Sequence, residues 1–264
     1  MVNFRRFLHK FYLGLVILFL YAPILVLIVL SFNSSKSRSK WGGFTTKWYS
    51  SMFANDTIML ALKDTLLIAV LSALLATVLG TVAAIAINHM RKVPRTIMLG
   101  ITNIPMLNAE IVTGISLMLL FLALDLNLGF ITVLLSHIAF NVPYVILSVM
   151  PKLAQTNQST YEAALDLGAT PLKAFFLIVL PDIFPGVISG FLLAFTLSLD
   201  DFIITHFTRG ATVNTLSTLI YSETRKGIKP EMYALSTLLF TGVLVLLILV
   251  NHLGKKSDNK NGKI

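Results

Sequence analysis

Long apolar runs, separated by shorter polar connections, are the main feature of the chain. A helix needs about 20 apolar residues to cross the roughly 30 Å hydrocarbon core of a bilayer. The runs lack strand-like alternation, and lipid admits only helices or closed barrels. The sequence therefore predicts an all-α membrane protein with a single transmembrane domain over residues 1–264. Six such runs predict spans at about 11–32, 64–88, 97–124, 129–150, 185–204 and 233–253.

The composition agrees with a polytopic membrane protein. Of the 264 residues, 56% are hydrophobic and 12% are charged, and the mean hydropathy is +0.82. The first apolar run follows Arg5, Arg6 and Lys10, as the core of a signal peptide would. It is longer than such a core, however, and no small-x-small cleavage site follows it. We therefore expect this run to remain as the first span.

The residue types exclude several kinds of chemistry. The sequence contains no cysteine, which excludes disulfides and thiolate metal sites, and its five histidines show no metal-ligand spacing. It also has no G-x-x-x-x-G-K-[ST] loop to hold a nucleotide. We therefore expect no metal, no cofactor and no catalysis, ATP hydrolysis included. No basic patch interleaved with aromatic residues indicates a nucleic-acid partner.

The basic residues indicate an orientation, although weakly. With the N-terminus inside, the 21 Lys and Arg residues divide into 12 on the inner side and 9 on the outer side. This bias follows the positive-inside rule and favours two cytoplasmic termini. The net charge of +9 comes from the connections and chain ends, where it can contact anionic membrane lipid.

The connection 151–184 is interrupted too often by polar residues, glycine and proline to span a membrane. It is also more apolar than a solvent-exposed loop without a function. Residues 159–162, Ser-Thr-Tyr-Glu, fit a capping box that would begin a short helix. Gly168 would end this helix in the left-handed conformation, and Thr170-Pro171 would cap and begin a second helix that Pro181 and Pro185 end. On composition alone, the apolar faces of these helices are equally consistent with packing under the bundle.

The same connection resembles a known motif. Glu162-Ala163-Ala164, Gly168 and the segment 178–181 match the E-A-A-x3-G-x9-I-x-L-P loop of permease subunits of bacterial ABC importers. In that family the loop is cytoplasmic, and its first short helix docks on the ATPase. The resemblance implies a type I ABC importer permease-like fold in which 151–184 is the cytoplasmic coupling loop. The implied coupling residues are Glu162, Ala163, Ala164 and Gly168.

Further stretches extend the resemblance over nearly the whole chain. "SFNSS" at 31–35, "GFTTKWY" at 43–49, "GISLMLLF" at 114–121 and "FTLSLDDF" at 195–202 resemble PotC-type permeases of spermidine/putrescine importers. The resemblance implies a multi-pass protein of the bacterial inner membrane that moves a polyamine. It also implies three partners: a dimer of ATPase subunits, a second related permease, and an extracytoplasmic polyamine-binding protein.

Three carboxylates in apolar surroundings are candidates for the substrate path. Asp200 lies about 21 Å into the fifth span from Gly186, and Glu110 lies about 20 Å into the third span, at 1.5 Å per residue. Together with Asp201 they are expected at one depth, and each would be costly facing lipid. A polyamine needs spaced carboxylates for its ammonium groups, so we expect a shared polar cavity. Ser198, in the same stretch as the aspartates, is assigned to this path.

Structural roles for these carboxylates remain open at this stage. The aspartates would alternatively cap a helix, pair with a loop cation such as Arg209, or stabilise the interface with the sister subunit. Glu110 would alternatively interact with the polar side chains of Asn103 and Asn108, near the helix break that Pro105 predicts.

Two smaller features complete the candidates. Trp48 and Tyr49 have the character of interfacial belt aromatics, and otherwise they would form a gate or stacking wall in the substrate path. Gly186-x-x-x-Gly190 predicts close packing of the fifth span against another helix.

Rival functions explain less of the sequence. A self-contained secondary transporter would use Asp200 and Asp201 as a proton relay, but it does not explain the presence of the E-A-A loop. A membrane enzyme would need a base, nucleophile or metal set that the sequence does not supply. A third alternative keeps the ABC permease and changes the cargo to another cation or a metal chelate.

Overall fold

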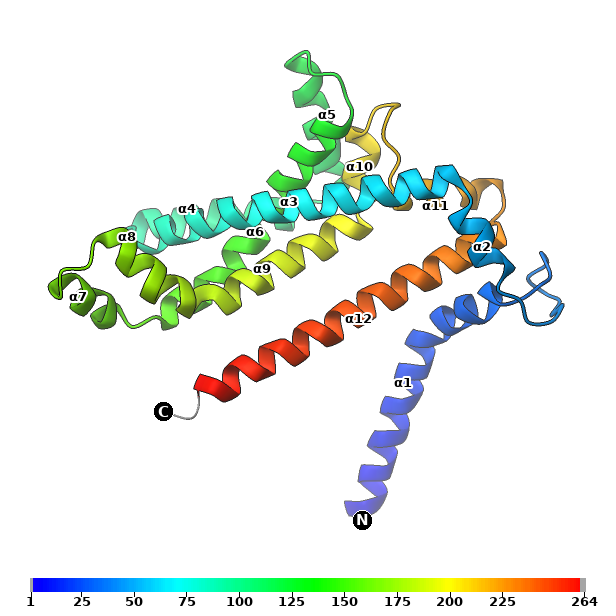
Figure 1. Ribbon diagram of the computed structural model, residues 1–264, viewed down its shortest axis with the longest axis horizontal. Coiled ribbons are helices and arrows are strands. Elements are labelled where there is room, and N and C mark those ends of the chain that lie inside the picture. The colour runs from blue at the N-terminus through cyan, green and yellow to red at the C-terminus, as the bar shows by residue number, and fades with distance from the viewer. Residues whose placement is uncertain (1, 262–264) are drawn as a thin grey trace. The chain divides into compact units, whose positions relative to one another are not determined.

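The structure is a computed structural model that describes residues 2–261, with side-chain environments for 10–157 and 159–245. Within the described part the regular structure is helical, apart from an isolated bridge between Asn33 and Phe44. The chain forms two compact units. One combines the chain up to Met59 with the chain from Ile220 onward, and the other is Leu60–Leu219. Figure 1 shows the elements of each.

The first unit contains three helices and an ordered loop. Its helices are α1 (Val2–Ser31), α2 (Lys47–Phe53) and α12 (Pro230–Asn261). Within α12, Pro230–Val245 is the apolar part that the side-chain description covers. The remainder of the span expected at 233–253 lies outside the described side chains. Lys10–Ser31 in α1 is long and apolar enough to cross a membrane, as predicted.

The second unit carries most of the candidate residues. Its helices begin with α3 (Asp56–Asn88), whose first residues belong to the first unit, and α4 (Lys92–Leu107). They end with the start of α11 (Leu216–Lys226), most of which belongs to the first unit. Between them lie α5 (Glu110–Ala123), α6 (Phe130–Gln155), α7 (Gln158–Asp166), α8 (Pro171–Ala174), α9 (Leu180–Asp200) and α10 (Ile203–Thr208).

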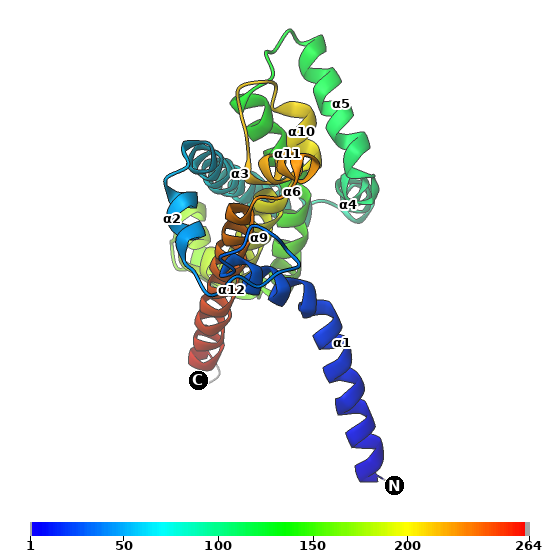
Figure 2. The ribbon, with the colours of Figure 1, turned by 90° about the vertical axis from the view of Figure 1, so that its right-hand side faces the viewer.

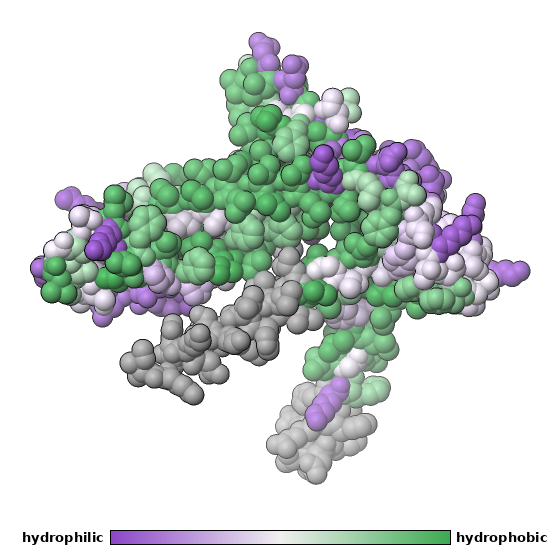
Figure 3. Space-filling model, in the orientation of Figure 1, coloured by the Kyte–Doolittle hydropathy of each residue, from purple (hydrophilic) through white to green (hydrophobic). Residues whose placement is uncertain are grey.

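The core of the second unit lies among α3, α6 and α9. Small residues such as Ala73 and Ala76 of α3 pack against Val145 and Val149 of α6 and against Ala194 of α9. The close approach predicted from Gly186 is confirmed, because a Cβ at that position would lie 3.0 Å from the carbonyl oxygen of a residue in α6. In Figure 3 the long flank of this unit is hydrophobic, while more polar residues gather at the end that carries α7. This distribution suits a bundle embedded in lipid.

The span expected at 97–124 is not one straight helix. It consists of α4 and α5, which are bent by 101° at Asn108 and Ala109, so it is a broken span or a re-entrant segment. Both residues have extended backbone conformations, with ψ of 147° and 133°. Pro105 in the last turn of α4 lacks the amide hydrogen that an uninterrupted helix requires. Figure 2 shows the two helices running in different directions.

The fifth span begins earlier than the hydropathy indicates. The helix is continuous from Pro171 to Asp200, and Pro181 and Pro185 lie inside it, so the expected helix end at these prolines is wrong. A π-helical turn at Phe175–Val179 ends two residues before Pro181. Its wider i to i+5 spacing accommodates the place where the proline cannot donate a hydrogen bond. The connection between α6 and α8 is therefore short, and α7 occupies most of it.

Candidate functional site

Asp201 lies at the break between α9 and α10, where both oxygens of its carboxylate accept hydrogen bonds. Its Oδ2 atom accepts hydrogen bonds from the Thr205 amide at 2.8 Å and the Thr205 hydroxyl at 2.7 Å. Its Oδ1 atom accepts from the Ile204 amide at 3.3 Å. The Nε2 atom of His137 in α6 lies 3.4 Å from Oδ2, and the Asp201 side chain is 6% exposed. The carboxylate therefore caps α10 from a buried position.

Asp200 has a different environment, although it is the neighbouring residue. It is exposed, and within residues 10–157 and 159–245 its carboxylate makes no hydrogen bond or ion pair with another residue. Arg209, the loop cation considered as a partner, donates instead to the Val213 carbonyl at 3.0 Å and to the Asn214 side chain. The alternative in which Arg209 pairs with an aspartate is therefore not found among the described residues. The Asp200 carboxylate remains available to a ligand.

Ser198 lies in a buried polar cluster rather than on an open surface. Its hydroxyl accepts a hydrogen bond from the Asn141 amide at 2.7 Å and lies 2.8 Å from the Ser72 hydroxyl. The three residues come from α9, α6 and α3, and all are buried. The Asn141 Oδ1 atom has no partner among the described residues. Ser198 thus ties three helices together inside the apolar core, where such bonds are difficult to replace.

Glu110 is the first residue of α5, directly after the break, and it is exposed. One turn further on, α5 packs closely on α10, because a Cβ at Gly114 would lie 3.4 Å from the Cα atom of Ile204. The helix that carries Glu110 therefore touches the helix that Asp201 caps. That Glu110, Asp200 and Asp201 share one depth and one cavity stays a prediction.

Trp48 and Tyr49 belong to the first unit, with structural contacts. The Trp48 indole is 6% exposed and donates to the Asn33 carbonyl at 2.6 Å, so it does not take the exposed position of a belt residue. The Tyr49 hydroxyl lies 2.8 Å from the Ser31 hydroxyl, and its ring stands beside Phe32 at 5.3 Å. Both side chains fasten the loop that follows α1.

The coupling loop contains the turn that the sequence predicts. Gly168 has φ of +85°, and its amide donates to the Leu165 carbonyl at 2.9 Å. The Ala169 amide donates to the Ala164 carbonyl at 3.0 Å. These two bonds form a Schellman motif. Thr170 caps the next helix as predicted, accepting from the Lys173 amide at 3.4 Å.

The start of α7 differs from the expectation. Asn157, not Ser159, caps the helix, because its side chain accepts from the Ser159 amide at 3.0 Å. Ser159 and Glu162 are therefore interior residues of α7 and form no capping box. Asn and Ser cap helices about equally well, so the capping-box pattern misplaced the start by two residues.

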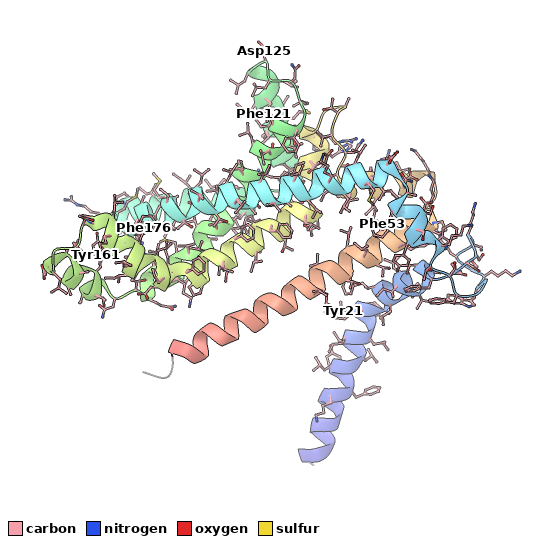
Figure 4. All side chains as sticks on the ribbon, in the orientation of Figure 1. Tyr21, Phe53, Phe121, Asp125, Tyr161 and Phe176 are labelled. Atoms are coloured by element: carbon pink, nitrogen blue, oxygen red, sulfur yellow. The ribbon has the colours of Figure 1, made fainter. Side chains whose placement is uncertain are left out.

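Apolar side chains lie open on this end of the second unit. Leu167 is 89% exposed, and Leu172 and Phe176 are 73% and 59% exposed. Glu162 and Ala163 are exposed on α7. Figure 4 shows Tyr161 and Phe176 on the same end of the unit. An apolar surface of this kind, rimmed by polar residues, is typical of a protein-interaction site.

No group of three or more His, Asp or Glu side chains capable of holding a metal ion occurs among the described residues. Sequence reasoning missed His137, Thr205 and Asn141 as members of the polar clusters. A signal for them existed, since each is a polar residue within an apolar run, where an unsatisfied side chain would be costly.

Comparison with known proteins identifies the family. Residues 76–258 match the sequence profile of the binding-protein-dependent transport system inner membrane component. The chain belongs to this family of permeases. The resemblance read from the E-A-A loop is thereby confirmed at the level of the family, and the permease is a transport component of a multi-pass inner-membrane type.

Two curated relatives from Escherichia coli (strain K12) are each 39% identical to the permease. The putrescine transport system permease protein PotI aligns over 92% of this chain and 89% of its own length. The spermidine/putrescine transport system permease protein PotC aligns over 92% of both chains. A PotC homolog from Mycoplasma genitalium is 33% identical over 96% of this chain and 90% of its own.

Solved structures confirm the fold. A chain of a bacterial ABC transporter involved in the import of the acidic polysaccharide alginate superposes with a TM-score of 0.72 at 19% identity, covering 97% of both chains. A chain of the MetNI methionine ABC transporter gives a TM-score of 0.60 at 17% identity, covering 76% of the permease and 96% of that chain. The permease therefore has the fold of ABC importer permeases.

Proposed function

We propose that the permease forms half of the translocation path of an ATP-driven importer for polyamines, with both of its units in one permease domain. The similarity to the putrescine and spermidine/putrescine permeases, over nearly the full length of each chain, carries this proposal. The site supports it, because the exposed carboxylates of Asp200 and Glu110 suit an ammonium group. A secondary transporter would not account for the family, which depends on binding proteins.

The partners follow from the same reasoning. We infer that two ATPase subunits, a second related permease and an extracytoplasmic polyamine-binding protein complete the importer. The exposed apolar side chains around α7 and α8 offer the ATPase a docking surface, with Glu162, Ala163 and Ala164 on the docking helix and Gly168 setting its angle. With α7 on the cytoplasmic side, and with α4 and α5 together crossing the membrane once, both chain termini also lie on the cytoplasmic side.

Uptake by the reconstituted complex tests the proposal. Proteoliposomes that contain the permease, its sister, the ATPase and the binding protein should accumulate labelled spermidine or putrescine when ATP is supplied. Asp200→Asn keeps the shape and removes the charge, so uptake per assembled complex should fall about tenfold or more, as expected for a charge-assisted hydrogen bond. Glu110→Gln should have a smaller effect.

Asp125→Asn is a matched control for loss of one carboxylate. Asp125 is exposed in the turn after α5, and its φ of 53° is one that asparagine tolerates. This variant should transport at the parent rate. Uptake of an unrelated cation or chelate in preference to both polyamines would reject the proposed cargo, while uptake that persists without the ATPase would favour the secondary transporter.

A further inference from the structure

The two adjacent aspartates differ in their contacts: the Asp201 carboxylate is hydrogen-bonded to α10, and the Asp200 carboxylate is exposed. α9 ends at Asp200 and α10 begins at Ile203, and Asp201 between them has a non-helical ψ of 127°, so the helix is interrupted at this point. The Asp201 side chain accepts from two backbone amides of α10, and the Asp201 carbonyl accepts from the Ser217 hydroxyl at 2.6 Å. Asp201 therefore fixes the break through both its carboxylate and its backbone.

A chain of polar side chains connects this break to α6. The Nε2 atom of His137 lies 2.9 Å from the Thr205 hydroxyl oxygen, and the Thr205 hydroxyl donates to Asp201. His137 is 2% exposed, and Thr205 is fully buried. One turn away, the Thr132 hydroxyl of α6 donates to the Thr208 carbonyl of α10 at 2.8 Å. α10 is thus fastened to α6 at two levels.

These contacts make Asp201 unsuitable as a ligand for a passing cation. An ammonium group that drew the carboxylate away would leave two amides of α10 and the Thr205 hydroxyl without their acceptor in a buried environment. Each loss of this kind carries a desolvation cost. The Asp200 carboxylate accepts no hydrogen bond from another of the described residues.

We propose that Asp201, Thr205 and His137 form a lock that sets the angle between α9 and α10, and that Asp200 alone of the aspartate pair contacts the transported cation. The assignment to a cation rests on the function proposed above, whereas the lock itself does not. Asp201, Thr205 and His137 are positioning residues, because they act on the substrate only through the placement of Asp200 and of α10.

A pair of substitutions at Thr205 separates the lock from general packing. Thr205→Val keeps the shape of the side chain but removes the hydroxyl that joins His137 to Asp201, whereas Thr205→Ser keeps the hydroxyl. Uptake per complex should fall about tenfold in the Val variant, the typical effect of one hydrogen bond to a charged group, and stay near the parent value in the Ser variant. Equal losses in both would overturn the lock.

Combining substitutions tests the division of tasks. If Thr205 and Asp201 belong to one lock, Thr205→Val should add little to the defect of Asp201→Asn, because the first change has already broken it. Thr205→Val and Asp200→Asn should instead multiply. The ratio of spermidine to putrescine uptake should change in Asp200→Asn, which removes a charge that meets the cargo, and stay constant in Thr205→Val. The reverse pattern of ratios would show that the lock residues contact the cargo.

A disulfide trap reports on the lock without any substrate. The chain has no cysteine, and a Cβ at Gly114 would lie 3.4 Å from the Cα atom of Ile204, so Gly114→Cys with Ile204→Cys places two thiols at the contact of α5 and α10. Under mild oxidation, adding Thr205→Val should slow disulfide formation about tenfold, because it removes the same hydrogen bond to the carboxylate. Adding Thr205→Ser or Asp200→Asn should leave the rate unchanged.

The two measurements distinguish the ways in which the reasoning could fail. If the parent complex moves no polyamine but the trap responds to Thr205→Val, the lock holds and the proposed cargo is wrong. If the parent transports polyamines and the trap ignores Thr205→Val, the cargo holds and the lock is wrong.

Discussion

Gly168 in the coupling loop offers a direct test of how the loop works. Its φ of +85° lies in the left-handed region, and two hydrogen bonds of the Schellman motif depend on this conformation. A Cβ built at Gly168 meets nothing within 4 Å. Replacing it by valine therefore introduces no clash with neighbours, and the cost arises from the backbone alone.

The size of this cost follows from the backbone conformation. An L-residue in the left-handed region is disfavoured by roughly 1–2 kcal/mol, and a β-branched side chain belongs at the upper end. This corresponds to a reduction of about 5- to 30-fold in the population of the native turn. Asparagine visits the same region far more readily, so Gly168→Asn is the matched control.

The assay measures the ATPase retained by the purified permease and the uptake per assembled complex. In Gly168→Val both should fall by about fivefold or more while the amount inserted in the membrane stays constant. Gly168→Asn should retain most of both. Normal ATPase binding and uptake in Gly168→Val would refute the idea that this turn sets the docking helix.

Three further predictions concern orientation and packing. An impermeant amine-reactive label applied to intact cells should modify the exposed Lys36 and not the exposed Lys173, and the reverse would overturn the proposed topology. Trp48→Phe leaves a backbone carbonyl without its donor, so it should destabilise the complex by about 1–3 kcal/mol in thermal unfolding without altering the ratio of spermidine to putrescine uptake. A changed ratio would instead place Trp48 in the path. Gly186→Val forces α9 away from α6 and should lower stability by about 1–3 kcal/mol, whereas Gly100→Ala, where a Cβ meets nothing within 4 Å, should be tolerated.

The parts of the fold that depend on short-range patterns were predictable. Hydropathy located the apolar cores of α1, α3 and α6, because a membrane span must be long and uniformly apolar. The turn at Gly168 and the cap at Thr170 are properties of a few consecutive residues, and both were found where predicted.

The departures from prediction have a common origin. Pro181 was expected to end a helix, but the preceding π-helical turn removes the conflict, and no local pattern announces such a turn. The bend between α4 and α5 was only hinted at by Pro105, since hydropathy continues across it. Hydropathy indicates which residues prefer lipid or the protein interior to water, and it contains little information about where the backbone bends.

In the candidate site, too, the sequence predicted which residues matter but not how each one is placed. Asp200 and Asp201 are identical in type and adjacent in sequence, so no property of either side chain distinguishes them. What distinguishes them is the position of His137 and Thr205, of which His137 comes from another helix and Thr205 lies one turn beyond the break. A charged side chain inside a bilayer needs a partner. Asp201 has its partners within the described chain, and Asp200 has none there. At the predicted depth, Asp200 therefore needs a partner from outside the chain, either the sister permease or a cationic substrate, and Asp201 does not. The sister-subunit alternative predicts loss of assembly in Asp200→Asn, whereas the substrate alternative predicts normal assembly with impaired uptake. Quantifying assembled complex and uptake separately in this one variant decides between the two.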